Sequence, residues 1–265
     1  MPETTAPVAY LLDLDGTLYA GGAAVPGAPE MLDRLRREGP PFRLVTNTTS
    51  RSRAMLVDRL RGYGFRVPPE EIFSATLAGA ALARELGYRS LAPFLPAPAL
   101  DDLAGFQLVG GVSGRRGVPD AVILGDLGEG WSYAVLQEAF QYVMGGAAII
   151  ALSRDRYWQR GDGLALDAGP FVRALEYATG RTAVVVGKPD PAFYRAAVDG
   201  LGLEPGQVVM VGDDVRSDVA GAQRAGLAGV LVRTGKFSPA DLTGDVSPDA
   251  VLDSVADLPR WWTGH

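Results

Sequence analysis

The residues Asp13-Leu14-Asp15-Gly16-Thr17 follow directly after the apolar run 8–12, Val-Ala-Tyr-Leu-Leu. The run has the length and composition of a buried strand, so both carboxylates fall where that strand ends. Carboxylates two positions apart on a strand share a face, and a turn beginning at Asp15 can bring the second toward the same metal ion as the first. The stretch therefore predicts a site that holds Mg²⁺ and handles phosphate.

Two other interpretations of this stretch involve no phosphate. Asp-Gly is a common turn signal, so the strand could simply leave the sheet here. An EF-hand loop also begins Asp-x-Asp, but Leu18 and Ala24 occupy the positions that require glycine and a bidentate glutamate. Calcium binding of that type is excluded, and the turn interpretation stays open for this stretch alone.

The composition limits both the size of the fold and its chemistry. With 265 residues, 47% of them hydrophobic, the chain can form one large domain or a core domain with a second, smaller one. A net charge of -6 argues against a nucleic-acid partner. The chain has no cysteine, and its one histidine is His265, which disfavours thiolate chemistry, a Ser-His-Asp triad and a three-histidine zinc site. Carboxylates, hydroxyls and lysines remain as reactive groups.

The hydropathy pattern favours a cytoplasmic protein without a membrane partner. The first residues carry no basic leader, and no window approaches 18 uninterrupted apolar residues.

Short apolar runs alternate with helical patterns along the chain, which predicts an α/β fold with a doubly wound, Rossmann-like parallel sheet. Amphipathic patterns predict helices over 28–38 and 52–63, the second with Met55, Leu56, Leu60 and Tyr63 on one face. The predicted strands are 8–13, 42–46, 182–186, 207–211 and 229–232.

Residues 82–181 have an α/β pattern of their own, which predicts an inserted domain within a catalytic core made of 1–81 and 182–265. Its expected elements are strands 121–124 and 147–152 and a helix over 132–144. We assign the apolar stripe of that helix to the domain's own core. The segment 93–98 has three prolines in six residues and is expected to be irregular.

Polar residues follow four of the predicted strands. Because ligands of an open α/β sheet bind outside the carboxyl ends of its strands, these residues are expected to form one site. These residues form four sets: Asp13 with Asp15, then Thr46 with Asn47, then Lys188, and finally Asp213 and Asp214 with Asp218. Taken singly, each set has a structural explanation, such as a helix cap or a surface lysine.

This order resembles the haloacid dehalogenase superfamily of phosphatases, and the resemblance covers nearly the whole chain. The insertion resembles the large α/β cap of the branch that contains p-nitrophenyl phosphatases. The segments 164–171, 174–178, 186–189 and 232–237 are similar to the phospholysine phosphohistidine inorganic pyrophosphate phosphatases. The resemblance implies Mg²⁺-dependent hydrolysis of phosphate attached to oxygen or nitrogen in a small substrate, and it suggests a homodimer through the cap.

We expect Asp13 to be the nucleophile and Asp15 the general acid and then base. The metal would be held by Asp13, Asp15 and Asp213, with the backbone carbonyl of Asp15 reaching it in the family pattern. Thr46, Asn47 and Lys188 are expected to donate hydrogen bonds to the phosphate. Asp214 and Asp218 are expected to orient Lys188 or metal waters. Substrate contacts are expected in the loop 153–167, from Arg154, Arg156, Tyr157 and Trp158.

Three rival functions use similar residues. A receiver-type signalling module also uses Asp, Thr, Lys and Mg²⁺, but it resembles a chain of about half this size with its acceptor Asp on a central strand and an acidic pair on the first. A non-catalytic phosphate-binding protein on the same fold is the second rival, and a phosphomutase is the third.

Overall fold

A computed structural model describes residues 8–110, 117–160 and 163–263. The chain forms two compact units. The first comprises the described residues up to Thr46, the range Leu56–Phe73 and the described residues from Lys188 onward. The second comprises residues 47–55 and the described part of residues 74–187.

A six-stranded sheet forms the centre of the first unit, in the order β15-β14-β13-β1-β4-β5. Strand β1 pairs in parallel with β13 on one side and with β4 on the other. The chain builds outward from β1 through β4 and β5, and later returns to build β13, β14 and β15 on the opposite side. The carboxyl end of β1 is therefore the topological switch point, where α/β sheets of this kind bind ligands.

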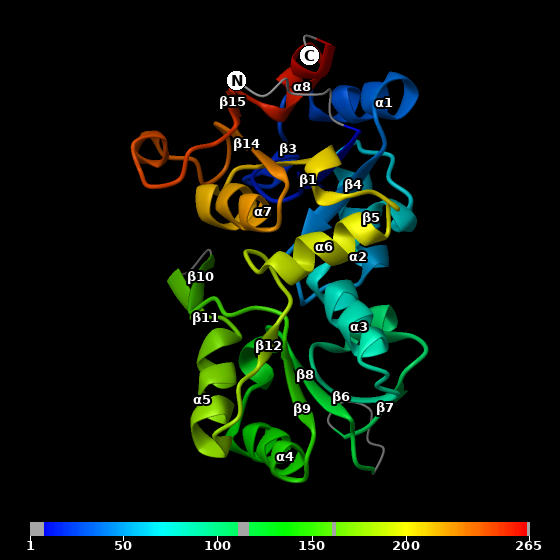
Figure 1. Cartoon of the computed structure of the whole chain (residues 1–265), viewed down its shortest axis with the longest axis vertical. Helices are drawn as coiled ribbons and strands as arrows, with labels where there is room; N and C mark the ends of the chain where they lie inside the picture. Colours follow the sequence, from blue (N-terminus) through cyan, green and yellow to red (C-terminus); the bar gives the residue numbers. More distant parts are fainter. Residues whose placement is uncertain (1–7, 111–116, 161–162, 264–265) are drawn as a thin grey trace. The chain divides into compact units, whose positions relative to one another are not determined.

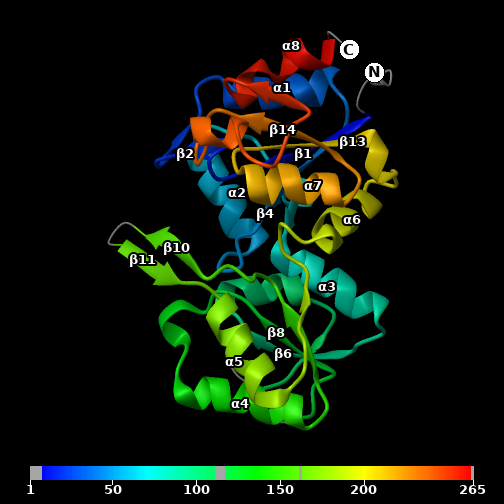
Figure 2. The same ribbon diagram turned by 60° about the vertical axis from the view of Figure 1, so that its left-hand side comes forward.

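Helices cover both faces of this sheet. Figures 1 and 2 show α1 and α8 on one side of the strands and α6 and α7 on the other. The first face buries alternate residues of neighbouring strands, such as Tyr10, Leu12 and Leu44, against α1 and α2. This period of two is that of a pleated sheet.

The first unit has the following elements: β1 Ala9–Asp13, β2 Tyr19–Ala20, β3 Ala23–Ala24, α1 Ala28–Glu38, β4 Phe42–Thr46, α2 Arg53–Gly62, η1 Pro69–Glu71, β5 Ile72–Ser74, α6 Pro191–Asp199, η5 Pro205–Gln207, β13 Val208–Gly212, η6 Val215–Ala220, α7 Gly221–Arg224, β14 Ala228–Val232, η7 Pro239–Leu242, β15 Ala250–Leu252, η8 Val255–Asp257 and α8 Leu258–Thr263.

The second unit has its own parallel sheet, in the order β12-β9-β8-β6-β7, and a separate hairpin of β10 and β11. Its core joins strand residues such as Val122 and Ile149 to helices α4 and α5. The elements are α3 Ala75–Glu85, β6 Ser90–Phe94, η2 Ala97–Leu103, β7 Gln107–Leu108, β8 Ala121–Leu124, η4 Gly128–Gly130, α4 Tyr133–Met144, β9 Ala148–Ala151, β10 Tyr157–Arg160, β11 Gly163–Leu166, α5 Gly169–Thr179 and β12 Val184–Val185.

The α/β prediction is confirmed, and so is the stripe of the helix over 132–144. Ser132 caps α4, because its side chain accepts a hydrogen bond from Val135 N at 3.3 Å. Ala139 and Val143 are buried in the core of the second unit. The remaining stripe residues, Val135, Leu136 and Phe140, pack against that core.

The predicted strand 182–186 was assigned to the wrong sheet. Its described part, β12, pairs in parallel with β9 through Val184 and Ile150 and so belongs to the sheet of the second unit. An apolar run predicts a strand but not its partner, because pairing is decided by residues distant in sequence.

The segment 93–98 is partly regular, contrary to the expectation. Leu91 O accepts a hydrogen bond from Val109 N on the β7 side of β6. The backbone nitrogen of Pro93, two residues further along the strand, points to the same side. Strand β7 ends at Leu108, so the missing N–H of Pro93 leaves the pairing with β8 intact.

The predicted face of helix α2 was also partly wrong. Met55 is exposed, and Val57 is buried beside Leu56 and Leu60.

Candidate active site

A buried ion-pair network lies at the carboxyl end of β1. Lys188 Nζ lies 2.5 Å from Asp13 Oδ1 and 2.7 Å from Asp218 Oδ1. The three residues come from separate parts of the chain, and each is at most 6% exposed. Charges buried to this extent are found paired because a lone charge is costly to remove from water.

The turn after β13 brings Asp218 back toward the strand end. Asp214 caps the π-helical segment η6 by accepting hydrogen bonds from Arg216 N at 3.0 Å and Ser217 N at 2.9 Å. Asp218 Oδ2 in turn accepts a hydrogen bond from Asp214 N at 3.1 Å. A side chain at Gly212 would collide with Asp218, since its Cβ would lie 2.2 Å from Oδ2. Glycine at 212 and aspartate at 214 and 218 are therefore local requirements of this turn.

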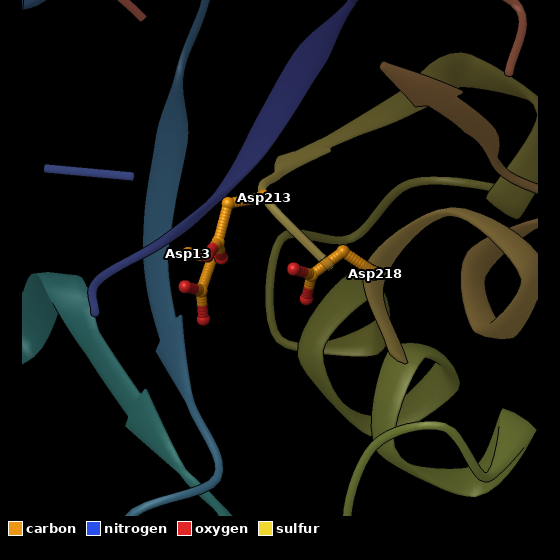
Figure 3. A group of neighbouring side chains, drawn as sticks. All are labelled: Asp13, Asp213 and Asp218. Carbon is orange, nitrogen blue, oxygen red and sulfur yellow. The ribbon is translucent and has the colours of Figure 1, made fainter. Parts of the chain in front are cut away.

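Asp213 provides a third buried carboxylate beside the network. Carboxylate oxygens of Asp13, Asp213 and Asp218 all lie within 4.8 Å of one another, and Figure 3 shows the three side chains gathered where β1 and β13 end. Asp213 Oδ2 accepts a hydrogen bond from Lys236 N at 2.6 Å. Hard carboxylate oxygens in this number are the donors that Mg²⁺ prefers, so these residues fit such an ion.

The electrostatics of the site are dominated by burial. Burial raises the pKa of Asp13 to about 6 against the opposing effect of Lys188, and it raises the pKa of Asp213 and of Asp218 to about 6 as well. Burial alone would lower the pKa of Lys188, but Asp13 and Asp218 raise that pKa well above its ordinary value. The lysine stays protonated beside Asp13 and Asp218, and with Asp213 nearby the three carboxylates outnumber the one cation, which leaves a net negative site suited to a cation.

These raised pKa values predict that the metal-free protein loses stability as the pH rises. A carboxyl group with a higher pKa in the folded state than in the unfolded state stabilises the fold at low pH, and this contribution disappears as the pH rises through the folded value. We expect the free energy of unfolding to fall by on the order of 2 kcal/mol between pH 4.5 and 7.5. Saturating Mg²⁺ should remove most of this difference, because the ion favours the charged carboxylates.

Urea unfolding in EDTA and in Mg²⁺ across this range measures the effect. The chain contains a single histidine, so imidazole titration adds little to the window. A metal-free stability that stayed level or rose toward pH 7.5 would contradict the prediction.

The other predicted site residues lie in several environments. Asp15 is exposed in the turn after β1, where Gly16 N donates a hydrogen bond to Tyr19 O at 2.7 Å. Thr46 is buried at the end of β4. Asn47 belongs to the second unit, and a Cβ on Gly187 would approach Asn47 Oδ1 to 3.1 Å.

Asp214 pairs with the second lysine of the chain and caps the turn after β13. Its Oδ2 lies 3.2 Å from Lys236 Nζ, and its Oδ1 caps η6 as described above. Lys188 is paired with Asp13 and Asp218, and the role of Asp214 in orienting Lys188 or metal waters stays a prediction.

Four predicted substrate residues lie in the second unit, on or just before β10. Arg154 pairs with Glu176, and the guanidinium of Arg156 lies 5.5 Å from the centroid of the Tyr157 ring. Tyr157 and Trp158 are 50% and 42% exposed. These two aromatic side chains therefore remain accessible on the hairpin.

Thr234, Gly235 and Lys236 also contact the site, although no role is predicted for them from the sequence. They follow β14, so the rule about strand ends that selected the other residues could have selected these as well. The chain contains two lysines, Lys188 and Lys236, and both contact carboxylates here.

Comparisons with known proteins agree with this fold. A family model described as haloacid dehalogenase-like hydrolase matches residues 10–105, and one described as HAD-hydrolase-like matches residues 185–258. The chain is 45% identical over 241 residues to haloacid dehalogenase-like hydrolase domain-containing protein 2 of Bos taurus, covering 91% of this chain and 90% of that protein. It is 38% identical over 259 residues to phospholysine phosphohistidine inorganic pyrophosphate phosphatase of Homo sapiens, covering 93% and 91%.

Solved structures show the same architecture. The p-nitrophenyl phosphatase from Archaeoglobus fulgidus superposes with a TM-score of 0.86 at 29% identity, covering 97% of this chain and 100% of that one. NagD from E. coli K-12 superposes with a TM-score of 0.84 at 28% identity, covering 96% and 98%. The chain belongs to the haloacid dehalogenase-like hydrolases, and it is an enzyme of their phosphatase group. This membership disfavours the receiver-type and purely phosphate-binding alternatives.

No described helix is long and apolar enough to cross a membrane.

Proposed function

We propose that this enzyme hydrolyses small phosphorylated compounds in an Mg²⁺-dependent reaction that passes through a phosphoaspartate on Asp13. The observation that carries the proposal is the buried Lys188 in contact with Asp13, whose carboxylate lies within 4.8 Å of those of Asp213 and Asp218. A lysine held this close to a carboxylate at a ligand-binding sheet edge can neutralise an incoming phosphate next to its nucleophile.

Two steps complete the proposed reaction. In the first, an oxygen of Asp13 attacks phosphorus, the bond to the leaving group breaks, and Asp15 gives that group a proton. In the second, Asp15 takes a proton from water, the water oxygen attacks phosphorus, and the bond to Asp13 breaks. The exposure of Asp15 suits this role, because its side chain must reach both the substrate and water.

The metal would be held by the carboxylates of Asp13 and Asp213 and by the backbone carbonyl of Asp15. When bound, Mg²⁺ offsets the repulsion between an anionic nucleophile and an anionic phosphate. Asp218 is assigned to holding Lys188, because its two oxygens accept hydrogen bonds from Lys188 Nζ and from Asp214 N. Thr46 and Asn47 are proposed to donate hydrogen bonds to the phosphate.

The second unit is proposed to select the substrate as an inserted cap, with Arg154, Arg156, Tyr157 and Trp158 as candidate contacts. The names of the related enzymes include both nitrogen-linked and oxygen-linked phosphate. We extend that range to this chain as its substrate class. Flat aromatic side chains on a hairpin can discriminate between leaving groups by stacking.

A panel of p-nitrophenyl phosphate, inorganic pyrophosphate, phosphohistidine and phospholysine tests the function. We expect phosphate release in Mg²⁺, release near background in EDTA, and full recovery when excess Mg²⁺ is restored. Release that persisted in EDTA would contradict the metal requirement, and a folded protein that released nothing would favour a phosphate-binding role. In Trp158→Ala, the ratios of kcat/KM between substrates should change, and unchanged ratios would contradict the role of this hairpin.

A further inference from the structure

The segment Thr234-Gly235-Lys236, here called the 234–236 loop, joins two parts of the proposed metal site. Lys236 N donates a hydrogen bond to Asp213 Oδ2 at 2.6 Å, and Thr234 Oγ1 donates one to Gly16 O at 2.6 Å. Gly16 directly follows Asp15 in the turn after β1, whereas Asp213 follows β13. One loop after β14 therefore bonds to the ends of two other strands.

Gly235 has a left-handed backbone conformation and no space for a side chain, so glycine is required at this position. Its φ is +59°, a left-handed conformation that glycine adopts without strain. A Cβ at this position would lie 2.1 Å from Asp213 Oδ2 and 2.5 Å from the Cα of Gly16.

Gly16 approaches the same carboxylate oxygen as Gly235. Its φ is +95°, and a Cβ there would lie 2.0 Å from Asp213 Oδ2. The backbones of two glycines thus lie close to Oδ2 of Asp213, and the same oxygen accepts a hydrogen bond from Lys236 N.

We propose that the 234–236 loop is a positioning element that holds the Asp213 carboxylate and the Gly16 turn in the arrangement that Mg²⁺ binds. The inference rests on the proposed function, because it takes Asp213 and the carbonyl of Asp15 as metal ligands. An N–H bond to one oxygen of a ligating carboxylate restricts its rotation, and a hydroxyl bond to Gly16 O restricts the turn that presents the Asp15 carbonyl. Partners of this kind typically change metal affinity about 10–100-fold when they are lost.

The backbone of Lys236 carries this role more than its charge does. The side chain is 73% exposed and pairs with Asp214, which is not one of the proposed ligands. Removing the charge in Lys236→Met is therefore expected to change the Mg²⁺ dissociation constant by about threefold at most, because an exposed ion pair contributes little.

The test measures Mg²⁺ binding to the metal-free, full-length protein by isothermal titration calorimetry, without substrate. We expect the dissociation constant to rise by about tenfold or more in Gly235→Ala and by several-fold in Thr234→Val. Two matched controls should keep the wild-type value. Gly206→Ala adds a methyl group where nothing lies within 4 Å, and Thr243→Val removes a hydroxyl bonded to Ala240 O in an exposed turn.

The outcomes separate the inference from the function beneath it. If the wild type does not bind Mg²⁺, or if Asp213→Asn binds it equally well, the proposed metal site and the inference both fail. If Asp213→Asn weakens binding while Gly235→Ala and Thr234→Val stay within twofold of the wild type, only the inference is overturned. Should Gly235→Ala not fold, Thr234→Val decides alone, and equal weakening in either control also overturns the inference.

Discussion

Replacing Asp13 by Asn is expected to lower turnover by roughly 10⁴-fold or more while the protein stays folded. The amide keeps the size of the side chain but lacks the negative oxygen that would attack phosphorus. Asp13 also shares its buried surroundings with Asp213 and Asp218, so removing one charge reduces their mutual repulsion. The metal-free variant should therefore unfold at the same temperature as the wild type or at a higher one.

Phosphate release and thermal unfolding measure both parts of this prediction. Asp58→Asn is a suitable control, because Asp58 is an exposed carboxylate paired with Arg61. Residual turnover above about one per cent of the wild-type value would rule out Asp13 as an essential nucleophile.

A trapped intermediate would identify the nucleophile directly. In Asp15→Asn, p-nitrophenolate can depart without a proton from the enzyme, but the water of the second step lacks its base. Mass spectrometry should then find phosphate covalently attached to Asp13 in Asp15→Asn and none in the double variant with Asp13→Asn. Attachment at another residue would contradict the proposed mechanism.

Replacing Lys188 by Met is expected to lower turnover by about 10³-fold and to destabilise the metal-free protein by about 3–5 kcal/mol near pH 7.5. Methionine fills much the same volume but leaves Asp13 and Asp218 buried without their shared cation. The loss of stability should shrink toward pH 4.5, because both carboxyl groups can then take up protons.

Urea unfolding at the two pH values and steady-state kinetics test this prediction. Arg61→Met removes a cation that is 71% exposed, and it should change stability by less than about 1 kcal/mol. A Lys188→Met protein as stable as the wild type at both pH values would contradict the prediction that Lys188 stabilises the buried carboxylates of Asp13 and Asp218.

The sequence by itself determined the fold class and the residues that follow the strands. Apolar runs and helical periodicity depend on neighbours in the chain, and the bounds of α1 and β4 match the prediction at both ends. The rule that ligands bind at the carboxyl ends of parallel strands selected Asp13, Lys188, Asp213 and Asp218. These four side chains lie together in the structure.

Only the tertiary structure decided which strands pair and which backbone groups reach a distant side chain. The sequence of β12 predicts a strand of the catalytic core, but the strand pairs with β9 of the second unit. Its own residues do not specify its partner. Asp214 pairs with Lys236, and the 234–236 loop bonds to Asp213, because β13 and β14 are neighbours in the sheet. A hydrogen bond from Thr234 to Gly16 spans more than 200 positions of the chain. Contacts at that separation leave no periodic pattern, so they appear only once the sheet is assembled.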